Sequence, residues 1–338
     1  RGHRGQAGPE VKISVLGAGS WGTALAIHFA RGGHDVCLWG RDRAVAEAIR
    51  RNGLHPRRLS GVRLPPSVRA TADLAEAAGH AETLVVSVPC ASFQGLLDAL
   101  PARGAGNRRF VSAAKGIDPE TGKRMSEVLR SRDPAAPVVA LSGPTFAEGV
   151  AKGDPTAAVL ADAGEGLARE LQAEFSTESF RFYSSDDLIG VELCGGLKNV
   201  VAIAAGIVSG LGFGHNTLAA LVTRGLAEIG RLVRSSGGKD RTVMGLAGVG
   251  DLLLTCTGKQ SRNRSVGEQI GRGRKLADVL SELPEVAEGA RTCLAVPTMA
   301  ARAGVEAPIA EAVVQVLYEG AAPRDAISRL MTRALRAE

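Results

Sequence analysis

The sequence is poor in aromatic side chains, and this scarcity shapes the core that we expect. Aromatic residues make up only 4% of the 338 residues, whereas 43 residues are glycine. We therefore expect packing through close approach of backbone segments more than through large rings. A hydrophobic content of 45% and a charged content of 22% are typical of a globular protein, and the length suggests two domains.

Cysteine and histidine are also sparse, and neither forms a metal-binding pattern. The five cysteines are scattered without a Cys-x-x-Cys pair, and the six histidines form no His-x-x-x-His pair. No metal site is therefore expected. The cysteines, which we expect to be small buried residues in a reducing compartment, are Cys37, Cys90, Cys194, Cys256 and Cys293.

Long hydrophobic runs and strong charge are absent as well. No stretch reaches about 18 uninterrupted apolar residues, and residues 1–10 lack the hydrophobic core of a secretory signal. We therefore expect a cytoplasmic protein without membrane insertion. The net charge of +6 is mild, and no basic run is interleaved with aromatic residues, which argues against a nucleic-acid partner.

The first half of the chain alternates short β-rich runs with helical patterns. This alternation is typical of βαβ units and predicts a mostly parallel sheet. Residues 52–67 are rich in Arg, Pro and Gly and are expected to form a surface loop. The expected strands are residues 11–16, 36–39, 83–88, 109–113, 138–141, 157–160 and 180–183.

From residue 189 onward the pattern becomes helical. Apolar residues between Leu218 and Val233 recur on one helical face behind Asn216-Thr217, which we expect to cap that helix. We therefore divide the chain into a Rossmann-type α/β domain over residues 11–188 and an all-helical domain over residues 189–336. A small apolar helical domain of this kind is compatible with a homodimer.

A glycine motif, Gly17-Ala18-Gly19-Ser20-Trp21-Gly22, lies between the first expected strand and a helical pattern. In that context G-x-G-x-x-G indicates a dinucleotide-binding turn. Gly17 allows the tight turn, Gly19 lets the backbone approach a pyrophosphate, and Gly22 lets helix and strand pack closely. The free N–H groups of the helix N-terminus then face the phosphates. A plain structural turn is the alternative.

The residues after the second expected strand bear on the choice of cofactor. An acidic residue there holds the ribose 2′-OH of NAD, whereas an arginine accepts the 2′-phosphate of NADP. The sequence reads Arg41-Asp42-Arg43, so Arg41 and Arg43 favour NADP(H) while Asp42 leaves NAD(H) possible. Alternatively, both arginines belong to the solvated first turn of a helix.

Two further segments follow expected strands, at the sheet edge where ligands bind in α/β folds. Lys115 either faces a ligand phosphate or carbonyl oxygen or is a solvated loop lysine. The segment 142–147, which contains Gly143, Thr145 and Ala147, either binds a ligand oxygen through N–H groups or simply starts a helix.

Lys198 opens the helical domain among small and apolar residues. Poor solvation lowers the pKa of a lysine and suits it to proton transfer, whereas the alternative is a lysine whose ammonium reaches solvent at a domain seam. Asp251 follows three glycines and either pairs with Lys198 or forms a local turn or cap. The run Ser261-Arg262-Asn263-Arg264 suits a phosphate at a helix start, or is an exposed basic cap.

Together these segments resemble the bacterial-type NAD(P)-dependent sn-glycerol-3-phosphate dehydrogenases. The matching stretches run in order over nearly the whole chain: VLGAGSWGTALA (15–26), LWGRD (38–42), AAKGID (113–118), LSGPTFA (141–147), GGLKNVVAIAAG (195–206), TRGLAE (223–228), GLAGVGDLLLTCT (245–257), QSRNR (260–264) and EG (288–289).

The resemblance implies a reaction and a set of contacts. The family reduces dihydroxyacetone phosphate reversibly to sn-glycerol 3-phosphate for glycerophospholipid synthesis, and Lys198 matches its catalytic acid/base, with Lys115 and Asp251 beside it. Matches to cofactor contacts are Ser20, Trp21, Arg41, Lys115, Ala147, Arg262, Val286 and Glu288. Matches to substrate contacts are Lys115, Gly143, Thr145, Asp251, Ser261, Arg262 and Asn263, with Lys198, Asn199 and Thr255 next to them.

Two segments depart from the family pattern. Cys194-Gly195-Gly196-Leu197 replaces the more usual Gly-Gly-Ala-Leu before the lysine, which bears on packing near the site. Arg57-Arg58-Leu59-Ser60 replaces a loop that more often carries an aromatic residue and Leu-Pro, so cofactor contacts from this loop are not carried over from the family.

Two other functions compete with this interpretation. A 3-hydroxyacid dehydrogenase, such as one acting on 6-phosphogluconate, shares the architecture and a Lys-Asn pair on a helix, but the QSRNR and AAKGID stretches argue against it. A redox-sensing regulator would bind NAD(P) without turnover, but the intact Lys198, Asp251 and Arg262 argue against that role.

Overall fold

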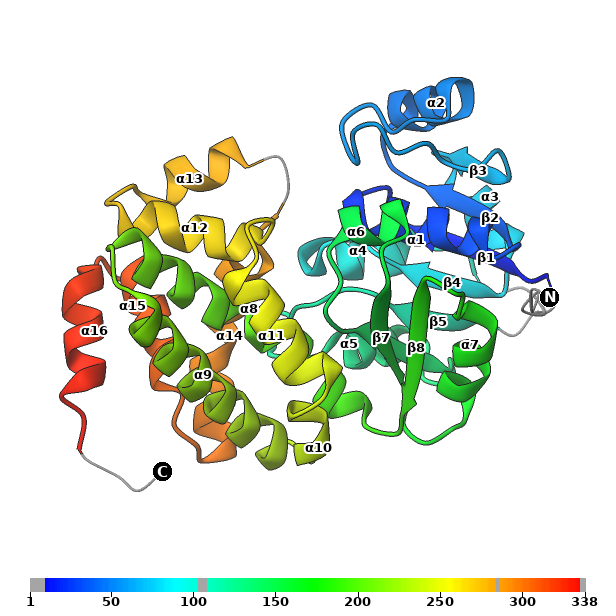
Figure 1. The fold of residues 1–338 in the computed structure, drawn as a ribbon. Helices are drawn as coiled ribbons and strands as arrows, with labels where there is room; N and C mark the ends of the chain where they lie inside the picture. The colour runs from blue at the N-terminus through cyan, green and yellow to red at the C-terminus, as the bar shows by residue number, and fades with distance from the viewer. Residues whose placement is uncertain (1–9, 103–107, 284–285, 335–338) are drawn as a thin grey trace, which may run out of the picture. The chain divides into compact units, whose positions relative to one another are not determined.

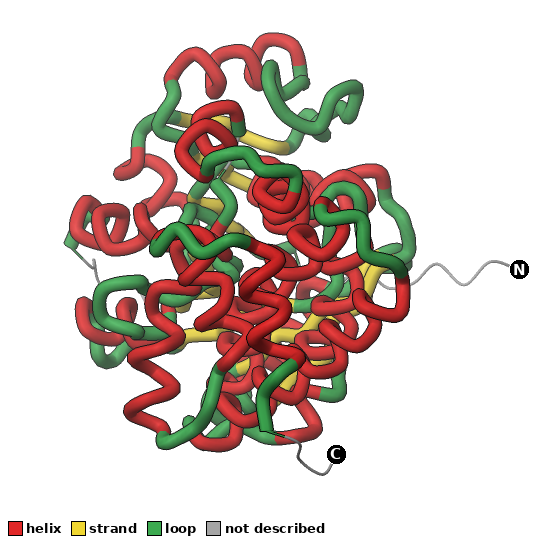
Figure 2. The backbone as a smooth tube through the Cα atoms, turned by 90° about the vertical axis from the view of Figure 1, so that its left-hand side faces the viewer, coloured by secondary structure: helices red, strands yellow, loops and turns green. Residues whose placement is uncertain are grey.

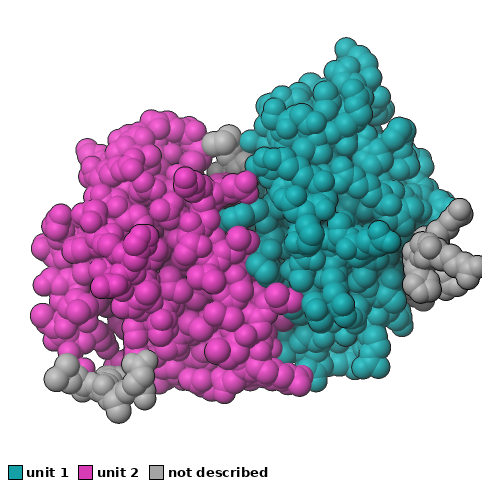
Figure 3. All heavy atoms as spheres, viewed as in Figure 1, with its two compact units in different colours: residues 1–114, 125–188 teal, residues 115–124, 189–338 magenta. Residues whose placement is uncertain are grey.

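The computed structural model describes residues 10–102, 108–283 and 286–334 (Figure 1). Residues 1–9 of the polar start and the last two residues of the expected helical domain lie outside these ranges. The described chain forms two compact units, which Figure 3 colours separately. The first comprises the described residues of 1–114 and 125–188, and the second those of 115–124 and 189–338. The segment 115–124, which the sequence division placed in the first domain, therefore groups with the second unit.

The first unit is built on an eight-stranded sheet of order β3-β2-β1-β4-β5-β6-β7-β8. Only β6 and β7 pair antiparallel, so the predicted Rossmann-type, mostly parallel sheet is confirmed. The strands are β1 (Lys12–Leu16), β2 (Asp35–Trp39), β3 (Val68–Thr71), β4 (Thr83–Val86), β5 (Arg109–Ser112), β6 (Val138–Ser142), β7 (Thr156–Ala161) and β8 (Phe180–Ser185).

Helices cover both faces of this sheet because alternate strand residues point to opposite sides (Figure 1). Phe110 of β5 joins a cluster with helices α3, α4 and α5, while its neighbour Val111 joins the cluster under α1, α2, α6 and α7. The helices of this unit are α1 (Ser20–Arg31), α2 (Arg43–Asn52), α3 (Leu74–His80), η1 (Cys90–Ser92), α4 (Phe93–Ala99), α5 (Met125–Arg132), α6 (Ala147–Lys152) and α7 (Leu167–Phe175).

Apart from an isolated bridge between Ile117 and Arg124, the named elements of the second unit are all helices, as predicted; Figure 2 colours helices red and strands yellow. The members of this unit are α8 (Leu188–Gly210, whose first residue belongs to the first unit), α9 (His215–Ser235), α10 (Asp240–Val243), the π-helical turn η2 (Leu246–Gly250), α11 (Asp251–Thr257), α12 (Arg262–Gly271), α13 (Leu276–Glu282), α14 (Glu288–Ala303), α15 (Pro308–Tyr318) and α16 (Pro323–Met331).

The central helix α8 lies against α12 at glycines. A Cβ on Gly206 would lie 2.0 Å from the carbonyl oxygen of Arg264, and a Cβ on Gly267 would lie 1.9 Å from that of Ile203. Since no side chain fits there, the two backbones approach closely. The contact of Gly267 with Ile203 lies one helical turn beyond Asn263 and Asn199, whose side chains are hydrogen-bonded to each other.

Helix α8 is the one described helix that is long and apolar enough to cross a membrane by length and composition. Its apolar window is 94% buried within the structure. A continuous apolar surface of this kind is what a helix surrounded by other helices needs. We therefore interpret α8 as the core helix of the second unit.

The start of α9 differs from the prediction. The sequence placed the cap at Asn216-Thr217, but the helix begins at His215 and its cap residue is Gly214, without a side-chain hydrogen bond. The extended backbone of Gly214 already leads into the helix, so Asn216 and Thr217 fall in the first turn.

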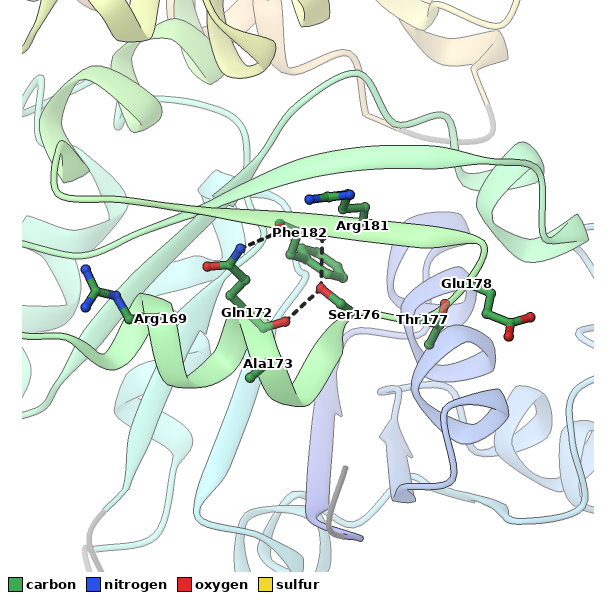
Figure 4. A pocket seen from close by; sticks show the side chains of 8 residues that line it. All are labelled: Arg169, Gln172, Ala173, Ser176, Thr177, Glu178, Arg181 and Phe182. Carbon is green, nitrogen blue, oxygen red and sulfur yellow. Dashed lines mark hydrogen bonds between the residues drawn. The ribbon is translucent and has the colours of Figure 1, made fainter. Parts of the chain in front are cut away.

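A surface depression of about 630 Å³ lies between α7 and β8 in the first unit (Figure 4). Gln172 donates to the carbonyl of Phe182, and Ser176 Oγ accepts from the Phe182 N–H while donating to the Gln172 carbonyl. These polar groups are thus engaged with one another. The lining residues are Arg169, Gln172, Ala173, Ser176, Thr177, Glu178, Arg181 and Phe182, and none was predicted as a site residue.

Candidate active site

The glycine turn after β1 has the geometry that its three glycines require. Gly17 has φ of +125°, and a Cβ there would lie 2.6 Å from the carbonyl oxygen of Ser87. A Cβ on Gly22 would lie 1.9 Å from the carbonyl oxygen of Gly17. A Cβ on Gly19, in contrast, would meet no atom within 4 Å. The turn is thus closely packed beneath its first and third glycines and open at its second, which fits a pyrophosphate approaching Gly19.

Arg41 and Asp42, which follow β2, differ in their environment. The Asp42 carboxylate accepts from the N–H groups of Ala44 and Val45 as the cap of α2 and forms an ion pair with Arg57. The Arg57 guanidinium is the main cause that lowers the pKa of Asp42. Arg41 is exposed. Both side chains lie at the surface, and the Asp42 carboxylate is already engaged by the start of α2 and by Arg57.

The remaining candidates of the first unit lie at the starts of helices. Ser20 and Trp21 are the first two residues of α1, and Ala147 is the first residue of α6. Between β6 and α6, Gly143 has φ of +136°, and Thr145 Oγ1 donates to the Gly143 carbonyl at 3.1 Å. These residues follow the carboxyl ends of β1 and β6, as expected for a ligand-binding edge.

In the second unit, one carboxylate lies between two lysines. Asp251 Oδ2 accepts from Lys115 Nζ at 2.9 Å, and Asp251 Oδ1 lies 3.0 Å from Lys198 Nζ. The side chains of Asp251 and Lys198 are 2% and 7% exposed, and that of Lys115 is 15% exposed. Asp251 therefore pairs with Lys198, as one of the two sequence interpretations held, and the described trio has two positive charges for one negative.

Thr255, one turn after Asp251 on α11, fixes the Lys198 ammonium. Its hydroxyl donates to the Asp251 carbonyl at 2.6 Å, so its oxygen accepts from Lys198 Nζ at 2.7 Å. An ammonium has three N–H bonds, and two of those on Lys198 point at Asp251 and Thr255. The third N–H is the one that can meet a ligand oxygen.

Lys115 has an unusual acidity for a lysine. Burial disfavours its charged form and Lys198 adds a like charge, and together they outweigh the attraction of Asp251 and lower the pKa of Lys115 to about 8. At pH 7 Lys115 is therefore mostly protonated, and it loses its charge within a moderately alkaline range.

Two asparagines connect the lysine segment to the start of α14. Asn199 Nδ2 donates to the Lys115 carbonyl at 2.8 Å and to the Gly195 carbonyl at 3.3 Å. Asn263 Nδ2 donates to Asn199 Oδ1 at 2.9 Å, and Asn263 Oδ1 accepts from the Gly289 N–H at 2.9 Å. This chain of buried amides fixes the backbone on either side of the lysine pair.

The segment 115–124 is anchored to the helical unit by residues that the sequence analysis missed. The Arg124 guanidinium donates to the Glu192 carboxylate at 2.9 Å, with side chains only 15% and 5% exposed. Ile117 is buried in the helical core, and a Cβ on Gly196 would lie 3.1 Å from Ile117 Cγ1. Gly196, one departure from the family pattern, thus leaves room for this segment. Arg124 and Glu192 carry no local signal because 68 positions separate them.

The other predicted residues of the second unit lie at or just before the starts of α12 and α14. Ser261 caps α12 by accepting from the Arg264 N–H at 3.2 Å, and Arg262 is exposed in the first turn of that helix. Glu288 is the first residue of α14, and Val286 precedes it at 42% exposure. Within the described ranges, no group of three His, Cys, Asp or Glu residues has the arrangement needed to hold a metal ion.

The fold and this arrangement define a class of protein. A parallel sheet with a glycine turn after β1, in one chain with a helical unit that buries a lysine–aspartate centre, is the architecture of an NAD(P)-dependent dehydrogenase.

Comparison with known proteins identifies the family. Residues 12–168 match the model of the NAD-dependent glycerol-3-phosphate dehydrogenase N-terminus, and residues 187–328 match that of its C-terminus. The chain therefore belongs to the NAD-dependent glycerol-3-phosphate dehydrogenase family and is an oxidoreductase. This membership confirms the family resemblance found in the sequence.

Individual relatives agree with this assignment. The chain is 46% identical over 331 residues to glycerol-3-phosphate dehydrogenase [NAD(P)+] of Syntrophotalea carbinolica, covering 97% of this chain and 99% of the relative. It is 47% identical over 332 residues to the protein of that name from Nitratidesulfovibrio vulgaris, covering 97% and 100%. The crystal structure of glycerol-3-phosphate dehydrogenase from Coxiella burnetii superposes with a TM-score of 0.90 at 36% identity, covering 96% of this chain and 99% of that one.

Proposed function

We propose that this chain reduces dihydroxyacetone phosphate to sn-glycerol 3-phosphate, reversibly, with Lys198 as the acid/base. The observation that carries the proposal is the single Asp251 carboxylate between Lys198, which is buried, and Lys115, which is partly buried. The excess positive charge suits a substrate that is itself a phosphate and gains negative charge on its carbonyl oxygen during reduction. The names of the relatives support this reaction.

Lys198 is positioned to give a proton to the substrate oxygen. Asp251 and Thr255 accept two of its N–H bonds, which leaves the third for the C2 oxygen of the substrate. Bound NAD(P)H supplies the hydride that reduces C2. As the oxygen gains charge, the Lys198 ammonium stabilises it and transfers the proton, and in the reverse direction the neutral amine removes it.

Lys115 adds electrostatic stabilisation in the same place. The Lys115 amino group shares Asp251 with Lys198. Because the pKa of Lys115 is about 8, this group is mostly in its charged ammonium form at neutral pH. A positive charge held in a buried position stabilises a developing oxyanion more strongly than one in water. We assign Lys115 to the substrate oxygen or phosphate and Asp251 to holding both lysines in place.

Further substrate contacts are proposed at the start of α12 and after β6. Arg262, exposed in the first turn of α12, suits the substrate phosphate, which the positive end of the helix also favours. Asn263 and Asn199 already use much of their amide groups within the protein, so we assign them chiefly to positioning. The remaining proposed contacts are Gly143, Thr145, Thr255 and Ser261.

For the cofactor we propose NADP(H) as the preferred ligand, with NAD(H) also accepted. The open side of Gly19 fits the pyrophosphate, and exposed Arg41 fits the 2′-phosphate, while Asp42 is engaged with α2 and Arg57. Other proposed cofactor contacts are Gly17, Ser20, Trp21, Gly22, Lys115, Ala147, Arg262, Val286 and Glu288.

An oxidation assay tests both parts of the proposal. We expect dihydroxyacetone phosphate to drive oxidation of NADPH, and of NADH with a higher KM. Arg41→Ala should raise the KM for NADPH by about tenfold with little effect on that for NADH, because one charged contact to a phosphate is lost. Turnover of a 3-hydroxyacid without activity on dihydroxyacetone phosphate would refute the proposed substrate. An equal effect of Arg41→Ala on both cofactors would refute the proposed preference.

A further inference from the structure

A buried histidine from the loop at residues 52–67 contacts the glycine turn at Gly17–Gly22. His55 is 7% exposed, and its Nε2 lies 2.9 Å from the carbonyl oxygen of Ala18, which stands between Gly17 and Gly19. The loop folds back on itself to bring His55 there. Leu54 pairs with Arg63 in an antiparallel bridge, and the Leu64 N–H donates to the Gly53 carbonyl at 2.9 Å.

The hydrogen bonds of His55 determine which ring nitrogen carries the proton. The backbone N–H of Arg57 donates to His55 Nδ1 at 3.2 Å, so Nδ1 must be an acceptor. In a neutral imidazole the other nitrogen then carries the hydrogen. Nε2–H therefore donates to the Ala18 carbonyl.

Fixing the Ala18 carbonyl also fixes the direction of the next N–H group. The Ala18–Gly19 peptide is trans, since the described chain has no cis peptide bonds. In a planar trans peptide the C=O and the N–H point in opposite directions. A donor that binds the Ala18 oxygen from one side therefore directs the Gly19 N–H to the other side. Among the three glycines of the turn, Gly19 is the one at which an added Cβ would meet no atom within 4 Å.

We infer that His55 is a positioning residue for the cofactor, because it holds the Ala18–Gly19 peptide with the Gly19 N–H toward the pyrophosphate. This inference rests on the proposed dinucleotide site. It gives the loop at residues 52–67 a role in cofactor binding that does not need the aromatic residue missing from segment 57–60. His55 touches the turn and not the cofactor, so its effect appears in cofactor affinity.

A matched set of variants tests the inference. His55→Leu keeps the volume but removes the donor, whereas His55→Gln keeps both an N–H donor and an acceptor. His80 is the control, since its side chain is 5% exposed and its Nε2 also lies 3.1 Å from a backbone carbonyl, that of Asp35 at the amino end of β2. Kd is measured by titration with NADPH, followed by NADPH fluorescence, and folding is measured by thermal unfolding.

We expect His55→Leu to weaken NADPH binding about 3- to 10-fold, the range of one lost hydrogen bond. His55→Gln should return Kd to within about twofold of wild type, and His80→Leu should leave Kd unchanged even where it lowers Tm. Equal Kd values for His55→Leu and His80→Leu would overturn the inference while leaving the dinucleotide site intact. Failure of the wild-type protein to bind NADPH or NADH would overturn the proposed function as well.

Discussion

At the glycine turn of the first unit, the groups that we propose to meet a ligand are main-chain N–H groups. In the second unit they are buried side chains held by other side chains. The turn at Gly17–Gly22 needs only the absence of Cβ atoms at set positions, as its close contacts show. The lysine centre needs Lys115, Lys198 and Asp251, which the fold collects from distant parts of the chain.

This difference separates binding from chemistry. A main-chain turn offers dipoles that suit any phosphate and cannot transfer a proton, whereas the Lys198 ammonium can. If the separation holds, variants of Lys198 should change turnover while cofactor affinity stays the same. Variants of the glycine turn should do the reverse.

The largest expected effect follows from removing Lys198, the proposed acid/base. Lys198→Ala should lower kcat by roughly 10²- to 10⁴-fold, the contribution of a positioned proton donor, with NADPH affinity nearly unchanged. The fold should tolerate this change because Asp251 keeps Lys115 as a partner. Steady-state rates and an NADPH titration of the same sample measure the two quantities.

The control for this variant is Lys259→Ala, an exposed lysine of the same unit, which should have wild-type rates. Turnover in Lys198→Ala close to that of wild type would remove this lysine from the mechanism. A large loss of NADPH affinity would break the separation between the glycine turn and Lys198.

The second prediction contrasts two glycines of the turn. Gly22→Ala should destabilise the protein by about 1–3 kcal/mol or more, because its Cβ would lie 1.9 Å from the Gly17 carbonyl oxygen. Gly19→Ala should leave Tm unchanged, since its Cβ meets no atom within 4 Å and its φ of −77° suits alanine. It should instead weaken NADPH binding by about tenfold, a loss of about 1.4 kcal/mol, by placing a methyl group against the pyrophosphate.

Thermal unfolding and NADPH titration distinguish these two outcomes. A Gly19→Ala variant with normal NADPH affinity would place the pyrophosphate elsewhere. A Gly22→Ala variant with wild-type Tm would mean that helix α1 can shift away from β1 without cost.

The local geometry of the glycine turn can be predicted from the sequence more readily than that of the lysine centre, for a physical reason. The glycine turn and its flanking strand and helix lie within a few residues of one another, so periodicity and composition suffice to find them. The Lys115–Asp251 pair joins residues 136 positions apart, and its geometry depends on where segment 115–124 packs. The pairing of Asp251 with Lys198 was one of two open interpretations, and only the folded chain decides between them.

The elements that the sequence analysis missed or placed wrongly also lacked a clear signal in the neighbouring sequence. Strand β3 is only four residues long, VRAT, and follows a loop rich in Arg and Pro, so it has no apolar run to reveal it. The predicted cap position of α9 was wrong. The helix is preceded by Gly214, an extended residue that makes no side-chain cap hydrogen bond. His55 lay unnoticed in the expected loop at 52–67, since its partner is a main-chain carbonyl of the glycine turn.

The third prediction concerns the alkaline limit of activity. Lys115 carries its charge below its pKa of about 8 and loses it above, so kcat/KM should fall by up to about tenfold per pH unit above pH 8. Lys115→Arg, whose guanidinium stays charged, should lower the rate but abolish this alkaline limb. An unchanged limb in Lys115→Arg would assign the titration to another group.

The smallest effects are two opposite pH dependences of stability, one from each unit. Burial lowers the pKa of His28, in α1, to about 4, despite its hydrogen bond to the Phe175 carbonyl. Burial raises the pKa of Glu228, in α9, to about 7, although it accepts from the N–H groups of Ile309 and Ala310.

The signs follow from which state binds the proton more readily. Between pH 4 and 6.5 the unfolded chain protonates His28 more readily, so this group makes the protein more stable as pH rises. Between pH 4.5 and 7 the folded chain protonates Glu228 more readily, so this group makes it less stable as pH rises. From pH 5.5 to 7 each contributes about 1–2 kcal/mol, with opposite signs.

Urea unfolding of wild type, His28→Gln and Glu228→Gln at pH 5.5 and pH 7 tests this pair. Relative to wild type, the free energy of unfolding of Glu228→Gln should change more favourably on going from pH 5.5 to 7, and that of His28→Gln less favourably. Both tryptophans, Trp21 and Trp39, lie in the first unit, so fluorescence follows that unit while circular dichroism follows mainly the helices. The comparison between variants isolates each group even if the units unfold together. Equal pH dependence in all three proteins would mean that neither buried group titrates differently on folding.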